Sequence, residues 1–367
     1  MQQAHQRHVG TKGERSAGNI DTIRRRQQKS SKATKDAPMA PLNQETGTAN
    51  KPHKLFVCVA LLFFTVSSTL CAQASKLPDG TYAYNTFVIP LVTESLKCII
   101  SIVLELSSTA IDSNGPDFNA QRFLRFSIPA ACYFVSNNCM FYIIRELGGV
   151  TFQVTNNLKI LSTGLMMRLF LGRKLRWLQW KALVVLAVGC AVTQLKTCVG
   201  DDFGEVGNRS FSKYSLGYAM VLLNAMASAT GGVVSEKLLK GSHQETGESI
   251  HCQNAQLYFF GAVFGLIAIR HDASSTRNTI ETLDDTTSMF RGFNVFAHAT
   301  ILSLTATGLL VSFVFKYMDN FVKCFVAAVS MLCVALFDAW TRDEKPSLQL
   351  FFGITLTCLA VEQYYFA

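Results

Sequence analysis

The chain consists largely of ten predominantly apolar segments separated by polar connections. A helix needs about 20 mostly apolar residues to cross the hydrocarbon core of a bilayer. The pattern therefore predicts an all-α integral membrane protein with ten transmembrane helices. The third segment contains several polar residues and the seventh is short, so these two are the least regular. The predicted spans lie near 55–74, 84–106, 122–145, 150–171, 177–195, 214–238, 253–269, 294–316, 320–340 and 347–366.

Composition agrees with lipid as the surrounding medium. Hydrophobic residues make up 49% of the chain and charged residues only 16%, whereas soluble domains have about 25% charged residues. Most of the net charge of +9 lies in residues 1–54, where eleven Lys and Arg face four Asp and Glu, a net of +7. This segment is expected to be a disordered cytosolic tail, so the charge does not indicate a nucleic-acid partner. The cysteines show no metal-site spacing, and neither a metal nor another cofactor is expected.

Three features predict the orientation of the chain in the membrane. The basic tail places the N-terminus in the cytosol, because cytosolic loops are enriched in Lys and Arg. The basic connection 173–176 then also lies in the cytosol. The N-glycosylation sequon at Asn208 falls in a lumenal loop, where glycosylation can take place. Ten spans return the C-terminus to the cytosol.

The ten spans divide into two halves of five, about 55–195 and 214–367. An odd number of spans per half makes the halves inverted relative to each other, which is a common plan of carriers with a binding site near the middle of the membrane. One local similarity supports this division. The fourth span contains Asn157-Leu158-Lys159, and the ninth begins Asn320-Phe321-Val322-Lys323.

Lys159 lies unusually deep in an apolar segment. An ammonium near the centre of a bilayer costs about 2.5–3.5 kcal/mol on insertion scales, so such residues usually face a polar interior or a ligand. One interpretation is a cation that binds an anionic ligand. The other is a side chain that extends to the nearer membrane surface.

Two further groups of charged residues have alternative interpretations. Glu94 and Lys97 are three residues apart and share a face of the second span, either as a structural ion pair or as part of a transport cycle. Lys316 lies at a cytosolic helix end, where lysine commonly serves as a membrane anchor. Asp319 and Asn320 are expected to cap the ninth span.

The seventh span contains two polar residues on one face. Asn254 and Tyr258 are four residues apart, and they offer an amide and a phenol to a cavity. Without other information such residues more often form hydrogen bonds between helices.

Several motifs together resemble the nucleotide-sugar transporters, in particular the group that carries CMP-sialic acid, UDP-galactose and UDP-N-acetylglucosamine. The resemblance runs from about residue 55 to the C-terminus, and its motifs occur in the family's order and spacing. They are TESLKC, SNN, FQVTNNLKIL with GRKL and LQW, EKLLKGS, QNAQLY and KYMDNFVKCF.

The resemblance implies a drug/metabolite transporter fold of ten helices in two inverted five-helix repeats. It also implies exchange of a nucleotide sugar for a nucleoside monophosphate by alternating access across the Golgi membrane. Lys159 and Lys316 match the family's phosphate contacts, and Asn254 and Tyr258 match positions that hold the nucleotide. Glu94 and Lys97 match a charged pair beside the central cavity.

The chain departs from the family pattern around the base and the sugar. Phe152 stands where relatives usually have tyrosine, Asn156-Asn157 replaces Tyr-Gln, Phe260 replaces a serine and Ser235 replaces an aromatic residue. The cargo therefore stays open between UDP- and CMP-linked sugars. A phosphorylated-metabolite carrier of the same superfamily and a transport-inactive, carrier-like scaffold are the alternatives.

The sequence does not indicate a membrane enzyme, because a DxD motif is missing and His251 and His298 are isolated. The C-terminal VEQYYFA carries no retrieval signal that separates the Golgi from the endoplasmic reticulum. Partners expected from the sequence are a nucleotide sugar, a nucleoside monophosphate and membrane lipid. Homo-oligomerisation stays open.

Overall fold

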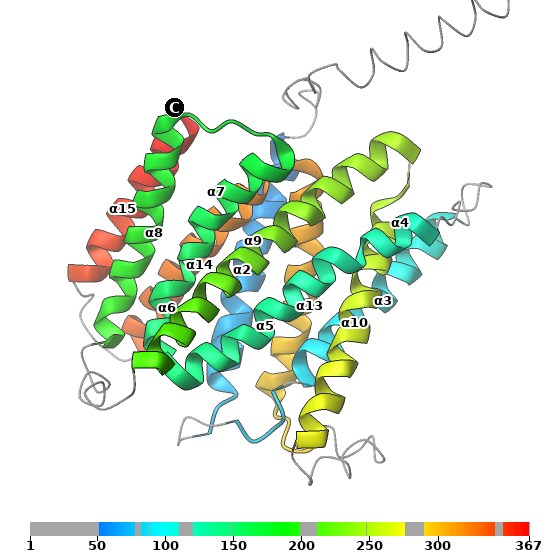
Figure 1. Ribbon diagram of the computed structural model, residues 1–367, viewed down its shortest axis with the longest axis horizontal. Helices are drawn as coiled ribbons and strands as arrows, with labels where there is room; N and C mark the ends of the chain where they lie inside the picture. Colours follow the sequence, from blue (N-terminus) through cyan, green and yellow to red (C-terminus); the bar gives the residue numbers. More distant parts are fainter. Residues whose placement is uncertain are drawn as a thin grey trace, which may run out of the picture. The chain divides into compact units, whose positions relative to one another are not determined.

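The computed structural model describes residues 51–77, 82–86, 88–109, 120–147, 149–198, 211–246, 248–275, 290–341 and 348–366. Every regular element in these ranges is a helix, which confirms the all-α prediction (Figure 1). Nearly all of the basic tail, and Asn208, lie outside the described residues. The helices are α2 (Lys51–Ala74), α3 (Val88–Thr109), α4 (Ala120–Arg125), α5 (Ser127–Leu147), α6 (Gly149–Asn156), α7 (Leu158–Leu171), α8 (Trp177–Cys198), α9 (Phe211–Thr246), α10 (Ile250–Ser275), α13 (Val295–Tyr317), α14 (Asn320–Thr341) and α15 (Leu348–Tyr365).

Five helices contain stretches that are long and apolar enough to cross a membrane: His53–Ala74, Ser215–Gly241, Ile250–Arg270, Val295–Tyr317 and Asn320–Thr341. The other five predicted spans correspond to α3, the end of α4 with α5, α6 with α7, α8, and α15. That these helices also cross the membrane stays a prediction. α3 differs from those five helices in composition, because its otherwise apolar sequence includes three charged residues, Glu94, Lys97 and Glu105.

The fourth predicted span consists of two helices, α6 and α7, rather than one. The residue between them, Asn157, donates from both its backbone N–H and its side-chain amide to the carbonyl of Val154, at 3.3 Å and 3.2 Å. Asparagine side chains compete in this way with the hydrogen bonds of a regular helix. α7 ends at Gly172, whose φ of 65° is in the left-handed region that favours glycine. Lys159 is thus the second residue of a short helix.

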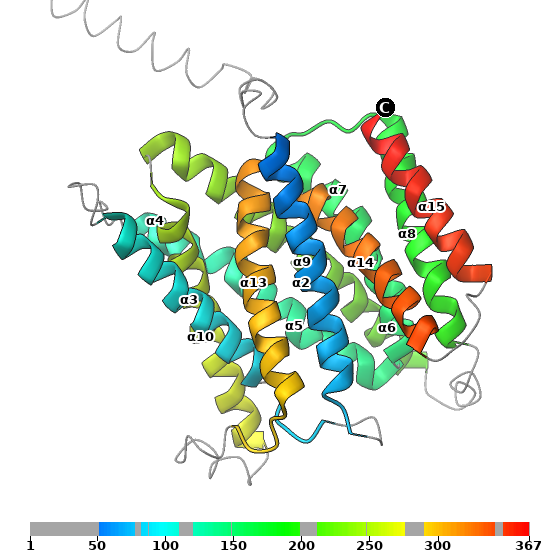
Figure 2. The ribbon, with the colours of Figure 1, turned by 180° about the vertical axis from the view of Figure 1, so that it is seen from behind.

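The most extensive helix packing joins the first half of the chain to the second (Figures 1 and 2). α2 packs against α13 and α14, and α9 packs against α5 and α7. α3 lies along α10, and α8 lies along α15. The two halves therefore interlock, and movement of one half against the other would change contacts along most of the helices.

The largest buried cluster lies where α7, α8, α9, α14 and α15 meet. Phe321 and Phe325 of α14 pack there against the ring of Tyr364, with ring centres 5.2 Å and 5.1 Å apart. Large apolar side chains on α2, such as Phe56 and Phe63, face outward and are 70% and 63% exposed. An apolar outer face of this kind is suited to contact with lipid.

Candidate functional site

The predicted phosphate contact, Lys159, lies near a second lysine, Lys323 of α14. The two ammonium groups are close enough to repel each other, and Cys324 lies near both of them. The Lys323 Nζ is 5.2 Å from the ring centre of Phe315 and 5.6 Å from that of Tyr133. In the part of the chain that the structure describes, neither lysine forms an ion pair with a carboxylate. Two partly buried positive charges therefore act on each other, and among the described residues no carboxylate pairs with either.

The beginning of α7 adds to this positive character. Its first turn contains Lys159 and no acidic residue. The N–H groups in the first turn of a helix lack partners within the helix, and they favour an anion there. Of these groups, the Ile160 N–H already donates to the Asn157 carbonyl at 3.0 Å, so the donors suited to an anionic ligand are chiefly the two lysines.

Lys316, the other predicted phosphate contact, has different neighbours. Its Nζ is 5.6 Å from the ring centre of Tyr317, and its charge acts on His251 at the start of α10. Among the described residues it is Lys323, and not Lys316, that lies close to Lys159. Lys323 was not among the predicted site residues, and the parallel between Asn157-Leu158-Lys159 and Asn320-Phe321-Val322-Lys323 is the sequence signal that could have indicated it.

Asn254 is fully buried, and neither its side-chain nitrogen nor its side-chain oxygen has a hydrogen-bond partner among the described residues. Buried polar groups in proteins are nearly always hydrogen-bonded, so an exception calls for a ligand, an ion or water. Its neighbour Gln253 differs, since it donates to the carbonyl of Glu248 at 3.2 Å and leaves only its oxygen unpaired. The Asn254 amide thus offers one donor group and one acceptor to a bound molecule.

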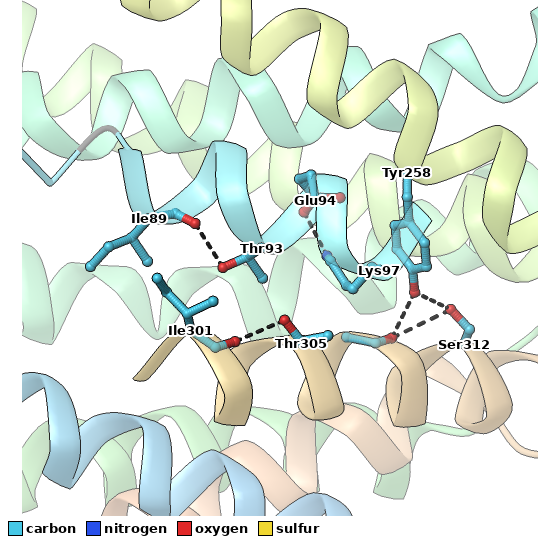
Figure 3. Close-up of polar contacts among 9 residues, drawn as sticks. Ile89, Thr93, Glu94, Lys97, Tyr258, Ile301, Thr305 and Ser312 are labelled. Atoms are coloured by element: carbon cyan, nitrogen blue, oxygen red, sulfur yellow. Dashed lines mark hydrogen bonds and ion pairs between the residues drawn. The ribbon is translucent and has the colours of Figure 1, made fainter. Parts of the chain in front are cut away.

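Tyr258 is buried one turn further along α10, and its hydroxyl already has protein partners (Figure 3). It donates to the carbonyl of Gly308 at 2.9 Å and shares a 2.8 Å hydrogen bond with the Ser312 hydroxyl. The Lys97 Nζ lies 4.4 Å from the centre of its ring. Tyr258 is therefore held by α13 through its hydroxyl and contacts a cation through its ring.

Glu94 and Lys97 form the predicted ion pair, with 2.6 Å between Oε1 and Nζ. Figure 3 shows the pair on α3 beside Tyr258, with Lys97 on the side of α13. Two glycines provide the space that the pair occupies. A Cβ at Gly261 would come within 2.8 Å of the Glu94 carboxylate, and one at Gly308 within 2.6 Å of the Lys97 side chain. The pair is thus enclosed by the close approach of α10 and α13 to α3.

The positions where the chain departs from its family pattern have different surroundings. Phe152 packs against Ile143 and Val221, and Phe260 belongs to the cluster around Phe126. The Ser235 hydroxyl and the Asn156 side-chain oxygen are buried and lack a hydrogen-bond partner in the described ranges. Phe152 and Phe260 thus pack in apolar clusters. Ser235 and Asn156 instead have buried polar atoms that could bind a ligand or water.

Known proteins define the class of this chain. Residues 49–365 match the family described as nucleotide-sugar transporter, and the chain belongs to that family. It is 34% identical to CMP-sialic acid transporter 1 of Arabidopsis thaliana, with 84% of this chain and 89% of that protein covered. It is 32% identical to the UDP-N-acetylglucosamine transporter of Mus musculus, with 83% and 92% covered. A crystal structure at 12% identity has the same fold, with a TM-score of 0.58 over 84% of this chain and 94% of that chain. The family comprises transporters and not enzymes.

Proposed function

We propose that the chain exchanges a UDP- or CMP-linked sugar from the cytosol for a nucleoside monophosphate from the Golgi lumen by alternating access. The family and the names of the relatives support the class of cargo. The observation that carries the proposal is the pair of unneutralised ammonium groups, Lys159 on α7 and Lys323 on α14. Both exchanged ligands bear phosphate, and both can therefore occupy one basic site.

The two lysines also suggest why transport would be an exchange. They lie on α7 and α14, which belong to different halves of the chain. Without a ligand, the repulsion between them opposes any closer approach of these helices, and it is stronger here than in water because the surroundings are less polar. A phosphate between them replaces the repulsion with two attractions. The loaded carrier then changes conformation more readily than the empty one.

The remaining predicted residues would hold the nucleotide. The Asn254 amide can donate to and accept from a base edge, and the ring of Tyr258 offers an apolar surface beside it. Lys316 contributes a further positive charge near the end of α13. The Glu94–Lys97 pair lies against Tyr258 and would respond to movement of α3 relative to α13.

In alternating access by inverted repeats, each half of the chain adopts in turn the conformation of the other half. The helix packing is consistent with two such halves, 55–195 and 214–367. Exchanging each helix with its counterpart converts the contact of α2 with α13 into that of α9 with α5. It likewise converts the contact of α2 with α14 into that of α9 with α7. In this arrangement both termini and the basic tail are cytosolic, and Asn208 is a lumenal glycosylation site.

A counterflow panel tests the proposed function. Proteoliposomes preloaded with UMP, CMP, GMP or AMP are offered each matched nucleotide sugar, and the initial uptake is measured. We expect UMP or CMP to stimulate uptake of its own sugar conjugates. Uptake stimulated only by a base-free phosphate ester would favour a phosphorylated-metabolite carrier. No stimulation by any of these ligands would favour a scaffold.

A further inference from the structure

Four charged side chains from both halves of the chain meet at the end of the helices where α7 is followed by α8. Arg173, in the connection between these helices, lies 2.7 Å from one carboxylate oxygen of Asp319, in the turn between α13 and α14. Lys240 of α9 lies 3.3 Å from the other oxygen of Asp319 and 2.6 Å from Glu236. Two cations and two carboxylates thus form one continuous chain of ion pairs.

Glu236 attaches this network to the beginning of α14. Its second oxygen accepts the backbone N–H of Asn320, the first residue of α14, at 3.0 Å. Its side chain is only 1% exposed. A buried carboxylate is strongly destabilising once its partners are removed, so Glu236 holds α9 and α14 together for as long as the network is intact.

The turn between α13 and α14 differs from the expected one. Asp319 was expected to cap α14 with its side chain, and this expectation is wrong, because the Val322 N–H donates to its backbone carbonyl at 3.0 Å and the Asn320 N–H to Glu236. The carboxylate binds Arg173 and Lys240 instead. Burial alone would raise the pKa of Asp319, but these two cations outweigh it and hold the pKa below its ordinary value. The carboxylate therefore stays ionised, and the ion pairs intact, at neutral and mildly acidic pH.

The network lies next to the two-lysine site. Lys323 is four residues after Asp319, hence about one helical turn further into α14, and Lys159 lies beside it. Arg173 and Asp319 also lie near Tyr364 at the end of α15. The ion pairs therefore lie about one helical turn from Lys323, on the side where α14 begins.

A pair of glycines precedes the network on α9. A Cβ at Gly232 would come within 2.7 Å of the Asn320 side chain, and one at Gly231 within 3.2 Å of Tyr133 and Cys132. Their small size lets α9 approach α14 and α5 closely. Adjacent small residues are also common sites of helix bending, and Glu236 follows Gly232 by one helical turn.

We propose that Arg173, Asp319, Lys240 and Glu236 form a latch that closes this end of the ligand site. The latch opens when the end of α9 moves at Gly231 and Gly232, and it closes again behind the ligand. This inference rests on the proposed function, because it assigns the latch to one of the two openings of an alternating-access carrier. The orientation proposed above makes this opening the cytosolic one.

Labelling of Cys324 tests the latch without any nucleotide. A membrane-impermeant thiol reagent is added separately to each side of vesicles that contain the whole protein, and peptide mass spectrometry follows modification of Cys324. We expect Asp319→Asn to label roughly fivefold faster than the wild type from the side of the α7–α8 connection. Asp319→Glu, which keeps the negative charge between Arg173 and Lys240, should label as slowly as the wild type. Lys174→Gln, on the same connection but exposed and outside the network, is the matched control.

Equal labelling of wild type and Asp319→Asn from both sides would overturn the latch. So would labelling of Asp319→Glu as fast as that of Asp319→Asn, provided that both variants elute as folded species. If labelling responds as expected but counterflow fails with every nucleotide, the latch stands and the proposed cargo is wrong. If counterflow succeeds but labelling does not change, the cargo stands and the latch is wrong.

Discussion

The Lys97 ammonium lies 4.4 Å from the centre of the Tyr258 ring while it forms an ion pair with Glu94. One cation therefore joins a charged pair on α3 to a tyrosine on α10 that is proposed to hold the nucleotide. A cation over an aromatic face is stabilising, and more so where water is excluded. Lys97 is only 7% exposed, so small changes in the packing around it should be measurable.

Gly308→Ala should disturb this arrangement. The added Cβ would lie 2.6 Å from Lys97 Cδ and 3.0 Å from its Nζ, so the lysine must move away from Tyr258 or α13 must shift. Added atoms in a packed interior typically cost about 1–3 kcal/mol. We expect a lower thermal midpoint in detergent and a reduced exchange rate.

Gly265→Ala is the matched control for Gly308→Ala. Gly265 lies on α10, and a Cβ added there would be 3.4 Å from the Leu91 side chain, which is an ordinary van der Waals distance. The two alanine variants are compared by thermal unfolding and by initial exchange rate. Equal effects from both substitutions would show that the space around Lys97 is not important.

The hydroxyl of Tyr258 is expected to position the ring and not to contact the ligand. Its partners are the Gly308 carbonyl and the Ser312 hydroxyl. Tyr258→Phe and Ser312→Ala should each weaken nucleotide binding, by up to about tenfold, because a lost hydrogen bond costs about 1 kcal/mol. The double variant should be no worse than the single ones, since the residues act as a unit.

Nucleotide affinity is measured by titration for Tyr258→Phe, Ser312→Ala and the double variant. The three losses of affinity give the coupling energy between the two residues. Fully additive losses in the double variant would contradict the positioning role. A loss with Tyr258→Phe that Ser312→Ala does not reproduce would assign the positioning to the bond with the Gly308 carbonyl, which Ser312→Ala leaves intact.

Asn254→Leu should separate binding from stability. The Asn254 amide is buried and has no hydrogen-bond partner in the described structure, so an apolar side chain of similar size removes an unsatisfied group without breaking a bond. We expect the ligand-free protein to unfold at the same temperature or higher, and the stabilisation by added nucleotide to disappear.

Gln256→Leu provides the contrast for Asn254→Leu. Gln256 donates to the Glu248 carboxylate at 2.6 Å, and its replacement should lower the thermal midpoint even without nucleotide. If Asn254→Leu destabilises the ligand-free protein as much as Gln256→Leu does, the amide has a structural partner and the proposal for Asn254 is wrong.

The sequence predicted the helices well but not how they meet. Apolar length and charge placement are local properties, and they were sufficient to locate the helical regions, although the predicted span 122–145 runs across the break between α4 and α5. The break at Asn157 was missed because it depends on one amide side chain competing for the Val154 carbonyl. A run of apolar residues gives no sign of such competition.

Contacts between the two halves were the least predictable part of the site. The proximity of Lys159 to Lys323, and the binding of the α14 N-terminus by Glu236 of α9, depend on residues far apart in the chain. The repeated Asn-to-Lys pattern was the only local sign of the lysine pair. The unpartnered amide of Asn254 could not be inferred at all, because an unsatisfied hydrogen-bonding group is a property of the packed structure.

Counterflow by lysine variants tests the two-lysine anion site most directly. Lys159→Ala and Lys323→Ala are reconstituted beside the wild type, vesicles are preloaded with the nucleoside monophosphate that stimulates best, and the initial uptake of its nucleotide sugar is measured. Thermal unfolding confirms that each variant is folded. We expect each substitution to abolish exchange, and Lys316→Ala to impair it less, because the charge that acts on Lys159 is that of Lys323 and not that of Lys316. Wild-type exchange with folded Lys159→Ala would contradict the account.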